Sequence, residues 1–121
     1  MTNPYQTYKQ QSVMTMTPGQ MLVALFDELI KQLNFAKLAF GTKNIPEINR
    51  SLLKSQAILR ELKSSLNFDY SIATNLSDLY DYFISALISA NTKKDPSGID
   101  DIIEMITELR NAFSDAEKSL R

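Results

Sequence analysis

The sequence lacks histidine and cysteine, and it contains only three glycines. Without His and Cys, the chain has no zinc site of the usual kind, no thiol nucleophile and no imidazole general base. A ferritin-like di-iron site needs Glu-x-x-His pairs, so it is excluded as well. Three glycines scattered along the chain do not build a phosphate-binding loop. Carboxylates are the only candidate catalytic groups that remain, and we expect no metal and no cofactor.

The chain also has little net charge and no long apolar run. A formal charge of −1 with scattered basic residues creates no field that would attract nucleic acid or an anionic membrane. No apolar run approaches the roughly 20 residues of a membrane span, and the N-terminal MTNPYQTYKQ lacks the apolar core of a signal peptide. The absence of cysteine agrees with a reducing compartment. We therefore expect a cytoplasmic protein without a nucleic-acid partner and without membrane insertion.

What the sequence does have is apolar residues at helical spacing. With 44% hydrophobic and 22% charged residues, the 121 residues suffice for one globular domain with its own core. Apolar side chains recur every three to four positions in four segments, 17–40, 46–66, 72–91 and 96–120. The short connections between them place neighbouring helices antiparallel. We therefore predict an all-α fold, an antiparallel up-down four-helix bundle over residues 17–121, preceded by an extended N-terminal arm over residues 1–16.

Polar residues mark where several of these helices are expected to begin. Thr17 is a candidate N-cap, Pro18 suits the first helical position, and Gln20 completes a capping box. Ser71 is predicted to cap the third helix, and Asp95 with the proline after it predicts the start of the fourth.

The third segment, residues 72–91, carries more apolar surface than one contact needs. Its apolar arc covers roughly 200° of the helix, whereas a surface helix needs roughly 100° to dock once. Such a helix is either central in its domain or contacts something beyond its own core. Tyr80 and Tyr82 border the arc on opposite sides, so they either lie at bundle edges with wet hydroxyls or rim a groove for an apolar peptide. Asn75 and Asn91 either bond within the bundle or bond the main chain of such a peptide.

Carboxylates cluster at one place, where Asp100, Asp101 and Glu104 open the fourth helix. Acidic residues in a first helical turn interact favourably with the helix dipole, which explains this cluster without any chemistry. No partner residue accompanies the cluster, so we do not expect an enzyme.

Three stretches carry a more specific pattern. The first reads N-P-Y-x-x-Y over residues 3–8 and continues as S-V-x-T-x-T-P-G over residues 12–19. The second reads L-K-x-Q-x-I-x-x-E-L over residues 53–62, and the third reads I-A-x-N-L-x-x-L-Y-D-Y over residues 72–82. In this order they cover almost the whole chain, and together they resemble the FliS family, the flagellin-specific export chaperones.

The resemblance implies a cytoplasmic antiparallel four-helix bundle that binds the disordered C-terminal segment of newly made flagellin. Holding this segment prevents premature polymerisation of flagellin, and the chaperone delivers it to the flagellar export gate. A disordered ligand pays an ordering cost on binding and therefore needs a large apolar track, which the wide arc over residues 72–91 offers. The implied protein is a monomer or weak dimer that needs no nucleotide and no metal.

The resemblance also implies which residues bind flagellin. They come from the second and third helices and are Leu53, Ile58, Leu62, Asn75, Leu76, Leu79, Tyr80, Tyr82, Phe83 and Leu87. We expect some of them to be buried core, first of all Leu76, Phe83 and Leu87, because the pattern does not separate a groove lining from an interior. In the arm, Tyr5, Tyr8 and Val13 are implied to cover part of the groove when flagellin is absent.

Two rival interpretations come from other classes of protein. The chain would be a structural helical subunit of a larger assembly if the wide arc were buried against a permanent partner, and it would then aggregate alone. An enzyme that uses carboxylates is a more distant alternative and would need a tightly bound metal or nucleotide. The sequence favours a flagellin export chaperone with no reaction of its own.

Overall fold

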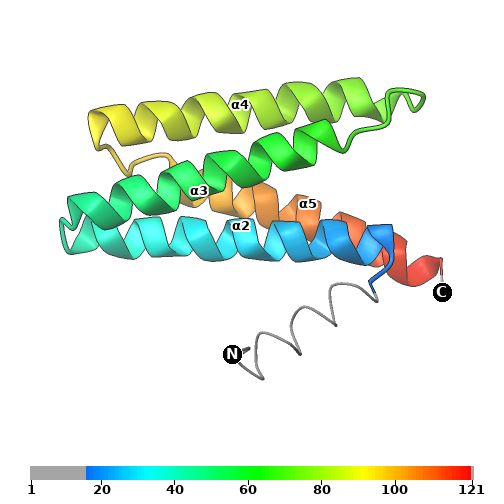
Figure 1. Cartoon of the computed structure of the whole chain (residues 1–121), viewed down its shortest axis with the longest axis horizontal. Helices are drawn as coiled ribbons and strands as arrows, with labels where there is room; N and C mark the ends of the chain where they lie inside the picture. The colour runs from blue at the N-terminus through cyan, green and yellow to red at the C-terminus, as the bar shows by residue number, and fades with distance from the viewer. Residues whose placement is uncertain (1–15, 121) are drawn as a thin grey trace, which may run out of the picture.

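The computed structural model describes residues 16–120, and helices account for most of them. They are α2 (Pro18–Gly41), α3 (Ile45–Ser64), α4 (Ile72–Lys93) and α5 (Ile99–Ser119). Successive helices run antiparallel, as Figure 1 shows, and no strand occurs among residues 16–120. The predicted all-α four-helix bundle is confirmed. The arm predicted over residues 1–16 lies outside the described residues except for Met16.

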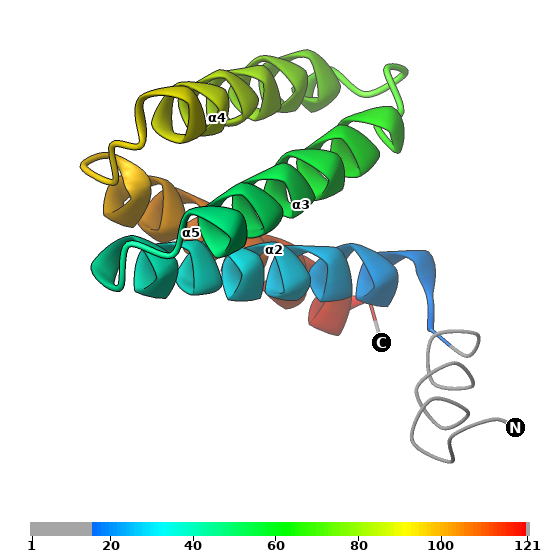
Figure 2. The ribbon, with the colours of Figure 1, turned by 60° about the vertical axis from the view of Figure 1, so that its left-hand side comes forward.

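The bundle has two unlike ends, which Figures 1 and 2 show from two directions. The closed end holds the α2–α3 turn and the α4–α5 connection. The open end holds the start of α2, the α3–α4 connection and the end of α5. At the open end α4 diverges from α2 and α5 in both views.

α2 packs between two neighbours in the bundle. It lies along both α3 and α5, whereas α4 packs along α3 and touches α5 only slightly. Phe26, Leu29 and Leu33 of α2 are fully buried, and the Phe26 ring stacks on Phe113 of α5 with 5.4 Å between ring centroids. Of the two alternatives for residues 72–91, the structure therefore contradicts the first, a helix central in its domain. α4 is not central, and it keeps apolar surface that its own chain leaves uncovered.

The start of α2 is built as its sequence predicts. The backbone N–H of Gln20 donates to Thr17 Oγ1 at 3.1 Å, and the backbone N–H of Thr17 donates to Gln20 Oε1 at 3.0 Å. Pro18 occupies the first turn, where a missing N–H costs nothing. The predicted capping box is confirmed.

The third helix begins at residue 72 as predicted, but the predicted cap by Ser71 and the predicted start of the fourth helix need correction. Ser71 adopts helical backbone angles, and its side chain makes no capping hydrogen bond to α4. Asp95 does not cap α5, which begins at Ile99. Its Oδ1 instead accepts the N–H of Ser97 at 3.0 Å, and this bond holds the pKa of the Asp95 carboxyl below its usual value. Asp95 therefore belongs to the turn before α5, because short polar side chains hydrogen-bond nearby backbone N–H groups in turns as well as at helix caps.

Candidate functional site

Most polar contacts between the helices lie within two pairs of helices, and one further hydrogen bond, from Arg50 Nη1 to Gln32 Oε1 at 3.3 Å, joins α3 to α2. One pair is α3 with α4, and the other is α2 with α5. The ties are Lys63–Asp81 (2.7 Å) and Lys94–Asn49 (2.6 Å) for the first pair, and Lys37–Asp100 and Arg110–Asp27 (2.8 Å each) for the second. Each pair is thus fixed internally by side-chain contacts.

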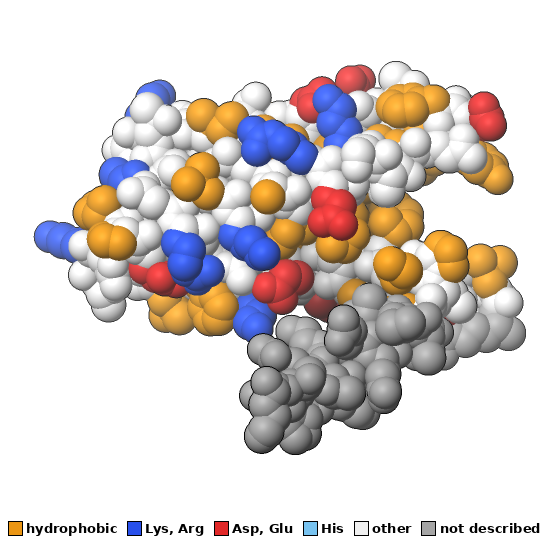
Figure 3. Space-filling model, in the orientation of Figure 1, with side chains coloured by type: hydrophobic (Ala, Val, Ile, Leu, Met, Phe, Trp, Pro, Cys, Tyr) orange, Lys and Arg blue, Asp and Glu red, His pale blue; other side chains and the backbone are white. Residues whose placement is uncertain are grey.

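A furrow separates α4 from α5, which barely touch one another. The short α4–α5 connection holds these helices together at the closed end, and they diverge toward the open end (Figure 2). In the space-filling view the open end is hollowed, with hydrophobic side chains on both sides of the hollow (Figure 3). The furrow is therefore an apolar surface on which α4 and α5 fail to cover one another.

The wide part of the furrow is a cavity of about 330 Å³ at the open end. Side chains from α4, the α3–α4 connection, α2 and α5 contribute to its walls. Its apolar and aromatic lining consists of Leu22, Leu66, Tyr70, Ile72, Ala73, Leu76, Tyr80 and Phe113. A concave site with such a lining is suited to apolar side chains of a ligand.

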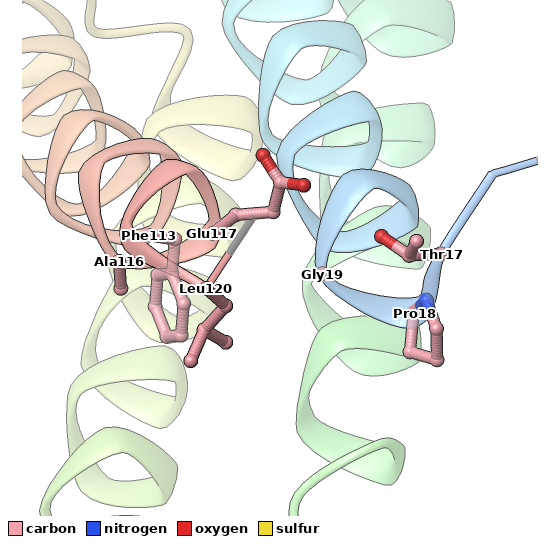
Figure 4. Close-up of a pocket in the computed structure, with 7 residues that line it drawn as sticks. All are labelled: Thr17, Pro18, Gly19, Phe113, Ala116, Glu117 and Leu120. Atoms are coloured by element: carbon pink, nitrogen blue, oxygen red, sulfur yellow. The ribbon is translucent and has the colours of Figure 1, made fainter.

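A second cavity, of about 480 Å³, adjoins the first at Phe113. Figure 4 shows that Phe113, Ala116 and Leu120 from the end of α5 face the first turn of α2 across it. Gly19 lies in that turn, where a Cβ would come within 3.0 Å of the Cγ of Glu117. A side chain at position 19 would therefore displace Glu117 from the cavity wall.

The narrow part of the furrow reaches the closed end. A cavity of about 230 Å³ lies there between α4 and the start of α5. Its apolar lining is Ala86 and Ala90 on one side and Ile99 and Ile102 on the other, and polar side chains also line it, namely Ser89, Lys93, Asp95 and Ser97. Leu79 is seven positions from both Ile72 and Ala86, which line the wide and narrow parts, so it shares their side of α4. The apolar track thus follows most of the length of α4.

The structure divides the predicted flagellin-binding residues into three groups. Leu53, Asn75 and Tyr82 are exposed, and Leu79 is half-buried. Leu76 and Tyr80 are buried and line the wide cavity. The remaining four belong to the hydrophobic core and are Ile58, Leu62, Phe83 and Leu87.

Only part of the predicted set is therefore brought together at the furrow. By helical spacing Asn75 and Tyr82 lie together beside Leu79, on the side of Ala86 and away from Tyr80. Leu53 lies on α3 and lines none of the three furrow cavities described above. Asn91 also stays within the bundle, because its Oδ1 accepts a hydrogen bond from Lys94 Nζ at 2.6 Å.

Tyr80 and Tyr82 have different surroundings. The Tyr80 side chain is 1% exposed and the Tyr82 side chain 54% exposed. Burial raises the pKa of the Tyr80 hydroxyl to about 12, because the phenolate would lose its hydration. A position at the bundle edge with the hydroxyl in water, one of the two alternatives for this pair, therefore fits only Tyr82. Replacing Tyr80 would damage the core, so Tyr82 alone can be replaced to test binding without unfolding the bundle.

Sequence reasoning did not assign several residues of the wide cavity to binding. Leu22, Leu66, Tyr70, Ile72 and Phe113 all line it. Leu22 and Phe113 also pack against the core of the bundle, so their helical spacing in segments 17–40 and 96–120 does not mark them as binding residues. A stronger signal was the α3–α4 connection, where Phe68 and Tyr70 place two aromatic rings in a segment that needs only polar turn residues.

The arm residues predicted to cover the groove, Tyr5, Tyr8 and Val13, lie outside the described residues. The described chain begins at Met16, which lines a groove between α2 and α3 together with Met21 and Leu25. The same groove continues past Leu22 and Ser65, which also line the wide cavity.

The acidic residues at the start of α5 show no sign of a reactive site. Asp100 is paired with Lys37 at 2.8 Å, and Asp101 and Glu104 are exposed. Among residues 16–120, no group of acidic side chains is arranged to hold a metal ion. Within the same residues, no helix is long and apolar enough to span a membrane.

Comparison with known proteins points in one direction. The family model described as Flagellar protein FliS matches residues 1–120. The chain is 32% identical over 119 residues to the flagellar secretion chaperone FliS of Bacillus subtilis, covering 98% of this chain and 90% of that one. It is 34% identical over 119 residues to the FliS chaperone of Vibrio cholerae, covering 93% and 88%.

A solved structure agrees with the fold. The chain described as "Crystal structure of flagellar chaperone from bacteria" matches with a TM-score of 0.80 and 22% identity, covering 95% of each chain. The family model and the relatives together establish that the chain belongs to the FliS family of flagellar secretion chaperones, which are binding proteins and not enzymes.

Proposed function

We propose that this chaperone acts in the cytoplasm and holds the disordered C-terminal segment of flagellin in the furrow between α4 and α5. The observation that carries the proposal is the apolar track along α4, which α5 leaves uncovered. A segment that is disordered before binding must bury much apolar surface to offset its ordering cost. The furrow offers such surface along most of α4, on a scaffold whose two halves are already fixed by ion pairs.

Occupying the furrow would keep the segment from pairing with other flagellin molecules, so the chaperone prevents premature polymerisation. In the proposed sequence of events the loaded chaperone, a monomer or weak dimer, then delivers flagellin to a component of the flagellar export gate. No metal, nucleotide or covalent step is required, because every part of this role is binding.

The absence of cysteine allows a direct test of where flagellin binds. Asn75→Cys places a single thiol on the exposed rim of the furrow, and Leu38→Cys places one on an exposed position of α2. Each variant carries a photo-crosslinker and is mixed with a peptide that covers the C-terminal segment of flagellin. We expect a crosslinked product from position 75 and little from position 38. Equal crosslinking at both positions, or none at position 75, would contradict the furrow as the binding site.

The N-terminal arm is proposed to cover part of this track when flagellin is absent, through Tyr5, Tyr8 and Val13. The support is the position of Met16, which lies in a groove that continues into the wide cavity. Deletion of residues 1–15 should then speed or tighten binding of the flagellin peptide, measured by stopped-flow fluorescence. Slower or unchanged binding would argue against a cover.

A further inference from the structure

The connection between α3 and α4 exposes aromatic rings at the mouth of the furrow. Phe68 and Tyr70 are 61% and 67% exposed, and Ile72 at the start of α4 is 60% exposed. Three large apolar side chains within five residues are unusual on a surface that nothing covers, because exposed apolar clusters on soluble proteins tend to mark contact sites.

The connection is held in shape by its own hydrogen bonds. Asn67 Oδ1 accepts the N–H of Asp69 at 3.0 Å, and the backbone oxygen of Asn67 accepts the N–H of Tyr70 at 3.2 Å. The backbone oxygen of Tyr70 in turn accepts the N–H of Ala73 at 3.1 Å, which joins the turn to α4. The turn is therefore already ordered before a ligand binds. Binding to its rings would cost little conformational entropy of the protein.

The turn is also continuous with the furrow. Tyr70 and Ile72 line the wide cavity together with Leu76 and Tyr80 of α4, so one apolar surface runs from the turn into the furrow. Phe68 lies two residues before Tyr70 in the same turn. A segment lying in the furrow must cross this turn if it leaves at the open end on the α4 side.

We infer that the α3–α4 connection is a second contact surface for flagellin, on which Tyr70 and Phe68 hold an apolar side chain where the segment leaves the furrow. The inference rests on the proposed function and adds to it a specific clamp at one end of the track. Aromatic rings on a rigid turn contribute contact area at low entropic cost, which is why such residues dominate the energetics of many interfaces. The clamp would also fix which part of the segment lies in the furrow.

The test measures binding of the C-terminal flagellin peptide to the full chain by isothermal titration calorimetry. Tyr70→Ser should weaken binding roughly tenfold, and Phe68→Ser should act in the same direction with a smaller change. Tyr70→Phe should bind like the wild type, because the ring is retained. Leu38→Ser is the matched control, since Leu38 is equally exposed at 69% but lies near the closed end, and its affinity should stay within twofold of the wild type.

The outcomes separate the clamp from the function on which it rests. Wild-type binding with unchanged affinity in both loop variants would overturn the clamp and leave the furrow intact. Absence of binding by the wild type would overturn both. If the turn instead contacts a second copy of the chain, sedimentation velocity will show less self-association in the loop variants, with unchanged peptide affinity, and the clamp is then wrong. Circular dichroism melts of all variants should coincide, because the replaced side chains are exposed.

Discussion

α2 and α4 are similar in length and apolar content but have different roles in the bundle. α2 packs against α3 on one side and α5 on the other, and its core residues have no exposed surface. α4 packs along α3 and leaves the side toward α5 partly open. The comparison teaches that apolar surface serves stability where neighbours cover it from both sides, and remains free for a ligand where one neighbour diverges.

The largest contrast should appear when a core residue of α2 is compared with a furrow residue of α4. Phe26→Ala should lower the free energy of unfolding by about 3–5 kcal/mol, because it leaves a cavity beneath Phe113 and Tyr80. Leu79→Ala should cost about 1 kcal/mol, because Leu79 is already half-exposed. Urea unfolding followed by circular dichroism measures both, and equal losses would break the contrast between the two helices.

Alkaline pH tests how deeply α4 is buried on its core side. The pKa of Tyr80 is raised from 10.0 to about 12, so its hydroxyl stays protonated in the fold at pH values where the unfolded chain has lost the proton. Stability is then fully present below pH 10 and decreases as the pH rises from about 10 to 12, by roughly 2–3 kcal/mol.

Tyr80→Phe should remove this part of the pH dependence. The difference between the two stability curves isolates Tyr80 from the lysines and from the exposed tyrosines, which titrate in both proteins. Parallel curves between pH 10 and 12 would mean that Tyr80 is more hydrated than the structure indicates.

The exposed side of α4 should respond to mutation in the opposite way. Tyr82→Ala should change the free energy of unfolding by no more than about 0.5 kcal/mol, because the ring is largely in water. If Tyr82 contacts flagellin as proposed, the same variant should bind the C-terminal peptide about tenfold more weakly, or by about 1.4 kcal/mol. Calorimetric titration decides this, and unchanged affinity would remove Tyr82 from the site.

The smallest expected effects concern the residues that follow α2 and α4. Lys43 and Lys94 both adopt the left-handed conformation, with φ of 55° and 52°. Glycine tolerates this conformation better than lysine does, so Lys43→Gly should stabilise the fold by about 0.5–1 kcal/mol.

Lys94→Gly provides the matched comparison. This substitution also removes the strain of a lysine at positive φ. However, it loses the hydrogen bonds from Lys94 Nζ to Asn49 and Asn91, so its net effect on the free energy of unfolding should be neutral or destabilising. Thermal melts that show equal gains for both variants would mean that Lys94 does not help to hold α4 on α3.

Much of this architecture follows from the sequence. Helical spacing predicts the four helices, and the Thr17–Gln20 capping box predicts the start of α2, because both depend on residues close together in the chain. The start of α4 was also predicted, although Ser71 makes no capping bond, whereas the start of α5 was wrong because Asp95 bonds within the preceding turn. Propensity does not distinguish a turn residue from a cap.

The binding surface was less predictable than the fold. The wide arc over residues 72–91 shows that α4 has surplus apolar surface, but it does not show which side faces α3. Phe83 and Leu87 proved to be core, whereas Tyr70 and Phe113 line the wide cavity from elements that the pattern treated as a turn and an ordinary core helix. Such assignments depend on how far α4 diverges from α5, which is a tertiary property.

The lining of the furrow has a consequence for the choice of client. Apart from Ser65 and Asn67, the wide cavity is walled by Leu, Ile, Ala and aromatic side chains. Such walls offer few fixed donors and acceptors, so they match the volume and spacing of a ligand more than its chemical identity. If flagellin binds in the furrow as proposed, tails that exchange one aliphatic residue for another at the same interval should bind alike, while a charge introduced at an anchoring position should prevent binding. One copy of this bundle could therefore serve a group of diverging flagellins without changing itself.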